Sequence, residues 1–67
     1  MAVLKVIEVL AESSSSWEDA AKEAVQEASK TVRGIRSIYV ENFQATVSDG
    51  AIDKFRINAK ITFAVDS

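Results

Sequence analysis

The sequence contains no cysteine, no histidine and no proline among its 67 residues. Without cysteine the chain forms no disulfide and no thiolate metal site. Without histidine it has no imidazole metal ligand and no His-based acid–base catalyst. A domain of this size buries only about 60% of the surface of its unfolded chain, so it usually needs additional stabilisation from a disulfide, a bound metal or oligomerisation. Because disulfides and these metal sites are excluded, oligomerisation is the source of additional stability that remains.

A basic surplus and long apolar runs are also lacking. The net charge is −2, whereas nucleic-acid-binding domains are usually basic. No stretch approaches the ~18 apolar residues that span a bilayer, and the apolar start of the chain is interrupted by Lys5 and Glu8. We therefore predict one folded cytoplasmic domain over residues 1–67, with neither a nucleic-acid nor a membrane partner.

The first half of the chain predicts a strand followed by a helix. Residues 3–11 are rich in Val, Ile and Leu on both faces, so we expect a strand that is covered on both sides. Residues 17–32 place apolar side chains at spacings of three and four, which indicates an amphipathic helix. The pair Ser16 and Asp19, or the serine–acid pair one residue earlier, forms its capping pattern, and Gly34 suits its C-terminal end.

The second half predicts a long hairpin. Residues 35–47 and 52–65 alternate apolar and polar side chains, and Asp49-Gly50 between them is a strong hairpin signal. The fold class is therefore α+β, with order β-α-β-β and an antiparallel three-stranded sheet of order 1-3-2 partly wrapped around the helix. One helix of ~24 Å cannot cover strands of ~43 Å. We expect the hairpin to leave an uncovered apolar surface that includes Ile38, Tyr39, Val40 and Phe43.

Several segments together resemble the dodecins over nearly the whole chain. They are Lys5-Val6-Ile7-Glu8, Ser16-Trp17-Glu18-Asp19-Ala20, Ala24-Val25, Ala28, Lys30-Thr31 and the strand from Ile57 to Phe63. The resemblance implies a hollow, spherical homododecamer that binds or stores flavins (riboflavin, FMN or FAD) in pairs between subunits and is not an enzyme. In the flavin binders a tryptophan of the second strand stacks on the flavin ring, and a glutamine of the third strand bonds its edge.

The sequence departs from this pattern at both positions. Ser37 stands where the stacking tryptophan is expected, and Arg56 stands where the glutamine is expected. Serine offers no π-face, and arginine offers donors but no acceptor. We therefore keep Ser37 and Arg56 as the candidate cofactor-binding residues but predict weak or absent flavin binding. Some dodecins that lack the tryptophan form a calcium-binding subgroup, so calcium or another ion is the alternative ligand.

Other readings of these residues stay open. Arg56 either lines a pocket for phosphate or carboxylate or forms an ion pair with Glu41 or a helix acid, and the ion pair is the commoner case. Trp17 is interpreted as an anchor at the helix start. The acids show no EF-hand spacing, so we assign no metal-ligating residue, and no nucleophile motif supports catalysis. A structural or ion-binding assembly and a module that docks a protein through its strand edges remain the alternatives to a ligand-binding shell.

Overall fold

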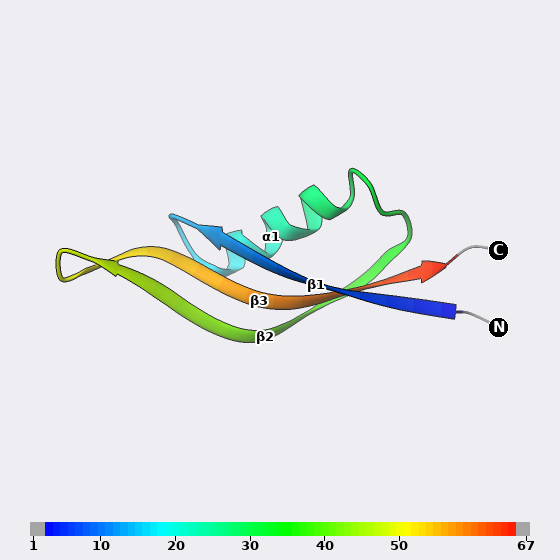
Figure 1. The fold of residues 1–67 in the computed structure, drawn as a ribbon. Coiled ribbons are helices and arrows are strands. Elements are labelled where there is room, and N and C mark those ends of the chain that lie inside the picture. The colour runs from blue at the N-terminus through cyan, green and yellow to red at the C-terminus, as the bar shows by residue number, and fades with distance from the viewer. Residues whose placement is uncertain (1–2, 66–67) are drawn as a thin grey trace.

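The computed structural model describes residues 3–65, which form three strands and one helix (Figure 1). The elements are β1 (Val3–Ser13), α1 (Trp17–Ala28), β2 (Ile35–Ser48) and β3 (Ala51–Val65). The strands form one antiparallel sheet in the order β1-β3-β2, and α1 crosses one of its faces. This arrangement confirms the predicted β-α-β-β fold.

The hairpin of β2 and β3 makes the molecule elongated, with principal extents of 51 × 20 × 13 Å. Its tip projects well beyond the helix (Figure 1). It also projects beyond β1, which ends opposite Phe55 while β3 begins at Ala51. A positive φ of 52° at Asp49 and of 77° at Gly50 closes the turn that the Asp-Gly pair predicted. No helix among residues 3–65 is long and apolar enough to cross a membrane.

The helix begins where the capping pattern predicts but ends earlier than expected. The Ser16 hydroxyl accepts a hydrogen bond from the Asp19 backbone N–H at 2.9 Å, which selects this pair as the cap. At the other end, α1 stops at Ala28 rather than at residue 32. The Ser29 hydroxyl donates to the Val25 carbonyl at 2.7 Å, and β-branched residues follow, so the helix gives way to tighter turns.

Gly34 therefore has a different role from the predicted helix end. Its φ is +73°, and its carbonyl accepts a hydrogen bond from the Ala64 N–H at 2.9 Å. A Cβ atom at this position would lie 3.3 Å from the Ala64 carbonyl oxygen. Gly34 thus lets the chain approach β3 closely as it enters β2.

The strict alternation predicted for the second strand is wrong in its middle. Register shifts in β2 occur at three places, one of them between Val40 and Asn42. Because a bulge adds one unpaired residue, the side chains beyond it change face. Tyr39 pairs with Lys60, whereas Phe43 pairs with the buried Ile57 and therefore lies on the helix side.

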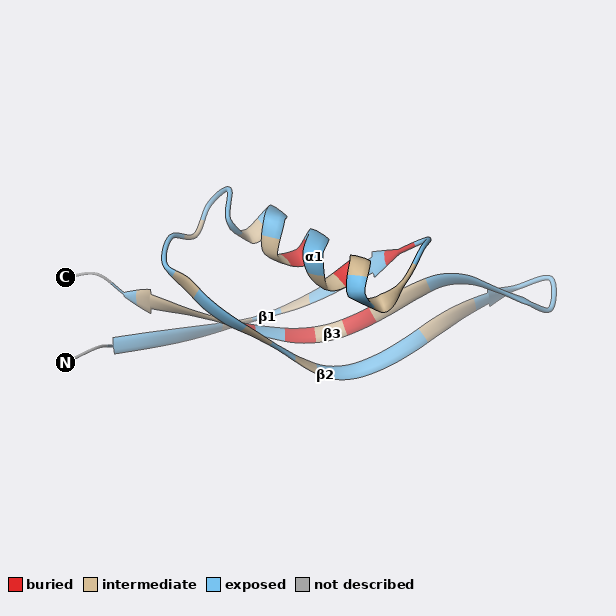
Figure 2. Cartoon of the chain, turned by 180° about the vertical axis from the view of Figure 1, so that it is seen from behind, coloured by how far each residue is buried: buried red, intermediate tan, exposed pale blue. Residues whose placement is uncertain are grey.

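The core is thin and lies between α1 and the middle of β3 (Figure 2). Ile57 and Ile61 are the largest fully buried side chains among the described residues.

Ile38 and Val40 pack against the core, which corrects the prediction that they are uncovered. Only one face of β1 is covered within the chain, and this corrects the prediction that both are. Exposed fractions of the large apolar side chains away from the core are 54% for Leu4 and Val6, 69% for Leu10, 65% for Tyr39 and 64% for Phe43.

Candidate functional site

The sheet face that points away from α1, here called the far face, carries both predicted ligand-binding residues. Ser37 pairs with Thr62, and Arg56 pairs with Gln44 on one side and with Glu12 on the other. Thr62 and Arg56 are six positions apart on β3, or about 20 Å at about 3.3 Å per residue. The structure therefore does not bring Ser37 and Arg56 together within one chain, and their role in binding stays a prediction.

Arg56 is held by an ion pair across the sheet. Its Nε and Nη2 donate to Glu12 Oε1 at 3.1 and 3.0 Å, while Lys54 Nζ donates to Glu12 Oε2 at 3.3 Å. These donors, Arg56 first and Lys54 second, lower the pKa of Glu12. The ion-pair reading of Arg56 is thus confirmed, but the partner lies on β1.

Glu41, which sequence reasoning offered as the partner of Arg56, pairs with Lys60 instead. Its carboxylate lies 3.0 Å from the Lys60 ammonium and raises the pKa of Lys60. This pairing leaves Glu8, the cross-strand neighbour of Lys60 on β1, without a described ion-pair partner. The far face therefore alternates paired charges with exposed apolar side chains.

Trp17 anchors the start of α1 on the side of the sheet opposite the far face. Its Nε1 donates to the Gln44 carbonyl at 2.9 Å. Its ring meets Phe43 and Phe55 edge to face, at centroid distances of 6.0 and 4.8 Å. The predicted anchoring role of Trp17 is confirmed, and this ring lies on the other side of the sheet from Ser37.

Tyr39 is the aromatic residue of the far face that sequence reasoning did not treat as a ligand contact. It lies two residues beyond Ser37 on β2 and is 65% exposed. The exposed ring offers a flat apolar surface with a hydroxyl at its end. The alternating pattern contained Tyr39 but grouped it with Phe43, because the bulge between them leaves no mark in that pattern.

A polar hollow of about 290 Å³ lies beside the helix start and is lined by three carboxylates. Its lining residues are Glu12, Ser13, Ser14, Asp19, Glu23 and Lys54. Ser13 Oγ donates to Asp19 at 2.7 Å, and the hydroxyls of Ser13 and Ser15 lower the pKa of Asp19. Across residues 3–65 no three acidic side chains gather closely enough to hold a metal ion. Calcium prefers six to eight oxygen ligands, which the three carboxylates of this hollow do not supply on their own.

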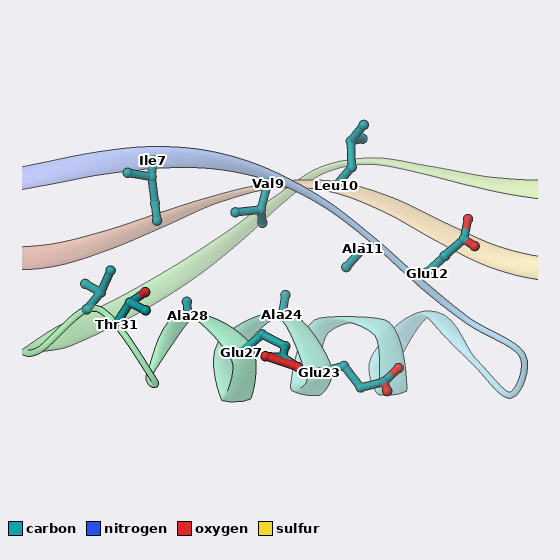
Figure 3. Close-up of a pocket in the computed structure, with 11 residues that line it drawn as sticks. Ile7, Val9, Leu10, Ala11, Glu12, Glu23, Ala24, Glu27, Ala28 and Thr31 are labelled. Carbon is teal, nitrogen blue, oxygen red and sulfur yellow. The ribbon is translucent and has the colours of Figure 1, made fainter.

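An apolar groove of about 480 Å³ runs between β1 and α1. In Figure 3, Ile7 and Val9 point from β1 toward the helix, while Ala24 and Ala28 point back from it. The small alanine side chains leave this space open, and Glu23 and Glu27 line its helix side. The groove therefore combines apolar side chains with carboxylates along its helix side.

Comparison with known proteins places this chain in a family. The family model described as dodecin matches residues 3–66. The chain belongs to the dodecin family. Dodecins are small oligomeric binding proteins, and the three antiparallel strands with one helix are the fold of this family.

The relatives include one that is named for calcium. The chain is 42% identical to the calcium dodecin of Mycobacterium tuberculosis over 64 residues, which cover 94% of this chain and 89% of the relative. The crystal structure of that calcium dodecin, described as calcium chelating, superposes with a TM-score of 0.83 at 38% identity, covering 96% and 91% of the two chains. The dodecin of Streptomyces coelicolor superposes with a TM-score of 0.94 at 24% identity, covering 98% and 94%, and shows the shared fold alone.

Proposed function

We propose that this protein is a non-enzymatic, cytoplasmic binding protein that works as a hollow homododecamer and has little affinity for flavins. The observation that carries this proposal is the uncovered far face of the sheet. Leu4, Val6, Leu10 and Tyr39 are each more than half exposed, and no described part of the chain covers them. Exposed apolar surface of this extent marks an interface, and the thin core leaves a single chain short of stabilising contacts.

The residues at the flavin positions argue against strong flavin binding. Ser37 lacks the ring on which a flavin stacks, and such aromatic contacts contribute about 0.5–1.5 kcal/mol each. The Arg56 guanidinium is engaged by Glu12 at 3.0 Å, and it has no acceptor for a ring N–H. The residues present therefore do not fit a stacked flavin, and we derive no binding step through one.

A second candidate is a calcium-binding assembly without an organic ligand. The 42% identical calcium dodecin favours it, as does the polar hollow beside the serine-rich loop. Because Glu12 and Asp19 are already engaged by Arg56, Lys54 and Ser13, we place a calcium site between copies rather than within one chain.

Native mass spectrometry of freshly purified protein tests the assembly and its ligand together. We expect a twelve-subunit species that carries no flavin mass. A monomer or dimer would contradict the proposed shell, and a dodecamer carrying flavin would contradict the predicted loss of flavin binding.

A flavin titration tests the reading of Ser37 and Arg56 directly. Quenching of riboflavin fluorescence reports the affinity. We expect the wild type to bind riboflavin weakly and Ser37→Trp/Arg56→Gln to bind it at least about tenfold more tightly, since about 1.4 kcal/mol is tenfold in affinity. Ser37→Leu/Arg56→Gln is the matched control, because it adds apolar bulk without a ring. Equal affinity of the two double variants would show that stacking at residue 37 is not what is missing.

Thermal unfolding with calcium tests the second candidate. A ligand at about 100 times its Kd stabilises the native state by about 2.7 kcal/mol, which shifts the Tm of a domain this small by about 10 °C or more. We expect this shift with calcium and its reversal by a chelator, with magnesium as the control. An unchanged Tm across the calcium titration would leave the candidate without support.

A further inference from the structure

The two free edges of the sheet differ in charge. In the order β1-β3-β2, both β1 and β2 are edge strands with one unpaired side. Glu8 on β1 and Glu23 on α1 lie on opposite sides of the free edge of β1, and we call these two residues the acidic edge. Both are exposed, and neither forms an ion pair with another described residue.

The opposite side of the molecule is basic. Lys22 of α1 borders a shallow apolar hollow shared with Ile38 of β2. Arg33 and Arg36 are exposed where the chain enters β2. We call Lys22, Arg33 and Arg36 the basic edge. None of the three forms an ion pair with another residue in the described range 3–65.

Other charges near the two edges do not remove this difference. On the β1 side, Glu27 is paired with Lys30, while Glu12 is held by two cations, Lys54 and Arg56. The second of these cations is offset by Asp19, which lines the same polar hollow as Glu12. Lys60, which lies opposite Glu8, is held by Glu41 on β2. Lys5 on β1 and Glu18 on α1 each place one opposite charge on their side of the molecule. A surplus of negative charge therefore remains at the acidic edge and a larger surplus of positive charge at the basic edge.

Each edge also offers an apolar surface beside its charges. The groove between β1 and α1 adjoins the acidic edge and is floored by Val9 and Ala24 (Figure 3). The shallow hollow on the β2 side is lined by Ala21, Val25 and Ile38 beside Lys22. Two apolar surfaces with opposite charge at their rims are complementary to each other and not to themselves.

We propose that copies of this chain associate head to tail, with the acidic edge beside β1 of one copy against the basic edge beside β2 of the next. The inference rests on the proposed self-assembly and names the surfaces that meet in it. A contact between two different surfaces of identical chains is heterologous, so it closes into rings rather than stopping at a symmetric pair. Such rings suit a closed shell.

Charge reversal tests the pairing of the edges. The acid-reversed variant is Glu8→Lys/Glu23→Lys, and the base-reversed variant is Arg33→Glu/Arg36→Glu. Either reversal places like charges across the contact, so we expect assembly at least about tenfold weaker, measured by native mass spectrometry at one subunit concentration. The swap variant carries all four substitutions and restores opposite charges between the substituted positions, while Lys22 is unchanged. We expect it to assemble like the wild type.

A matched control separates this contact from a general effect of net charge. Glu18→Lys/Asp53→Lys changes the net charge as much as the acid-reversed variant but leaves the acidic edge intact, so we expect it to assemble normally. Far-UV circular dichroism checks that each variant is folded. If a reversed variant does not fold, the neutral Glu8→Gln/Glu23→Gln variant replaces it, and we expect its assembly to be weaker and less sensitive to salt than that of the wild type.

The possible outcomes distinguish this inference from the proposed function. Reversed variants that assemble like the wild type would overturn the edge pairing and leave the dodecamer in place. A folded swap variant that fails to assemble would overturn it as well. A wild type that is monomeric would overturn both the edge pairing and the proposed shell.

Discussion

Replacing Ile57 by alanine tests how far the stability of the subunit depends on its thin core. Ile57 is fully buried on β3 beneath α1, where it clusters with Ala20 and Ala59. The substitution removes three carbon atoms, and each buried methylene contributes about 0.8 kcal/mol, so the transfer loss is about 2.4 kcal/mol. Because the neighbouring alanines are too short to fill the space, a cavity penalty adds to this loss. We expect a total of about 3–4 kcal/mol.

This loss is large for a domain whose free energy of unfolding is about 5–15 kcal/mol. It corresponds to a fall in Tm of at least about 12 °C, and the milder Ile57→Val should cost about 0.5–1.5 kcal/mol. Urea unfolding at a fixed subunit concentration, followed by Trp17 fluorescence and far-UV circular dichroism, measures these differences. The single tryptophan reports on the contact between the helix and the sheet, because its ring packs on Phe43 and Phe55.

Ile52→Ala is the matched control for this experiment. Ile52 is 57% exposed near the hairpin tip, so the same chemical change should cost less than about 1 kcal/mol. The reasoning would be refuted by an Ile57→Ala loss below about 1 kcal/mol, or by a loss no larger than that of the control. Either result would mean that contacts between copies, rather than this core, hold the subunit together.

Three further predictions follow from single contacts. Ser16→Ala removes the side-chain acceptor at the helix start and should lower the free energy of unfolding by about 0.5–2 kcal/mol, whereas Ser16→Asp should retain most of it in the same urea assay. The pKa of Glu12 is held below its usual 4.5, so its ion pairs add stability above about pH 4.5, and this is lost as the pH falls through the lowered pKa. A Tm series across that pH range should therefore fall less for Glu12→Gln than for the wild type, and parallel curves would contradict the ion pairs. Gly34→Ala should destabilise more than Gly50→Ala, because both positions have positive φ but only Gly34 has a backbone oxygen 3.3 Å from the new Cβ, and equal unfolding free energies would refute that close approach.

The element order was predictable because it depends on local patterns. The spacing of apolar residues, the Ser16 cap and the Asp49-Gly50 turn each act over a few residues, and each is found where the sequence indicates it. The sheet order followed from the hairpin and the helical crossover. The end of the helix was not predictable from Gly34, because the chain leaves the helix at Ser29, whose N–H and hydroxyl both donate to the Val25 carbonyl.

The candidate site was predictable only in part. Ser37 and Arg56 were selected through resemblance to the dodecins, and the structure puts both on the far face. The partner of Arg56 was missed, because Glu12 lies 44 positions away in the chain and is brought to it only by the pairing of β1 with β3. Tyr39 was missed as a far-face aromatic for a similar reason, since a bulge decides on which face it lies.

The sequence by itself determined that this protein has one helix on a three-stranded sheet and a core too thin for a long hairpin. These properties depend on composition and on spacing along the chain. Only the tertiary structure decided which charges pair, which apolar side chains stay uncovered, and that the two sheet edges carry opposite charge. These depend on strand register and on bulges, which bring together residues that are far apart in the sequence.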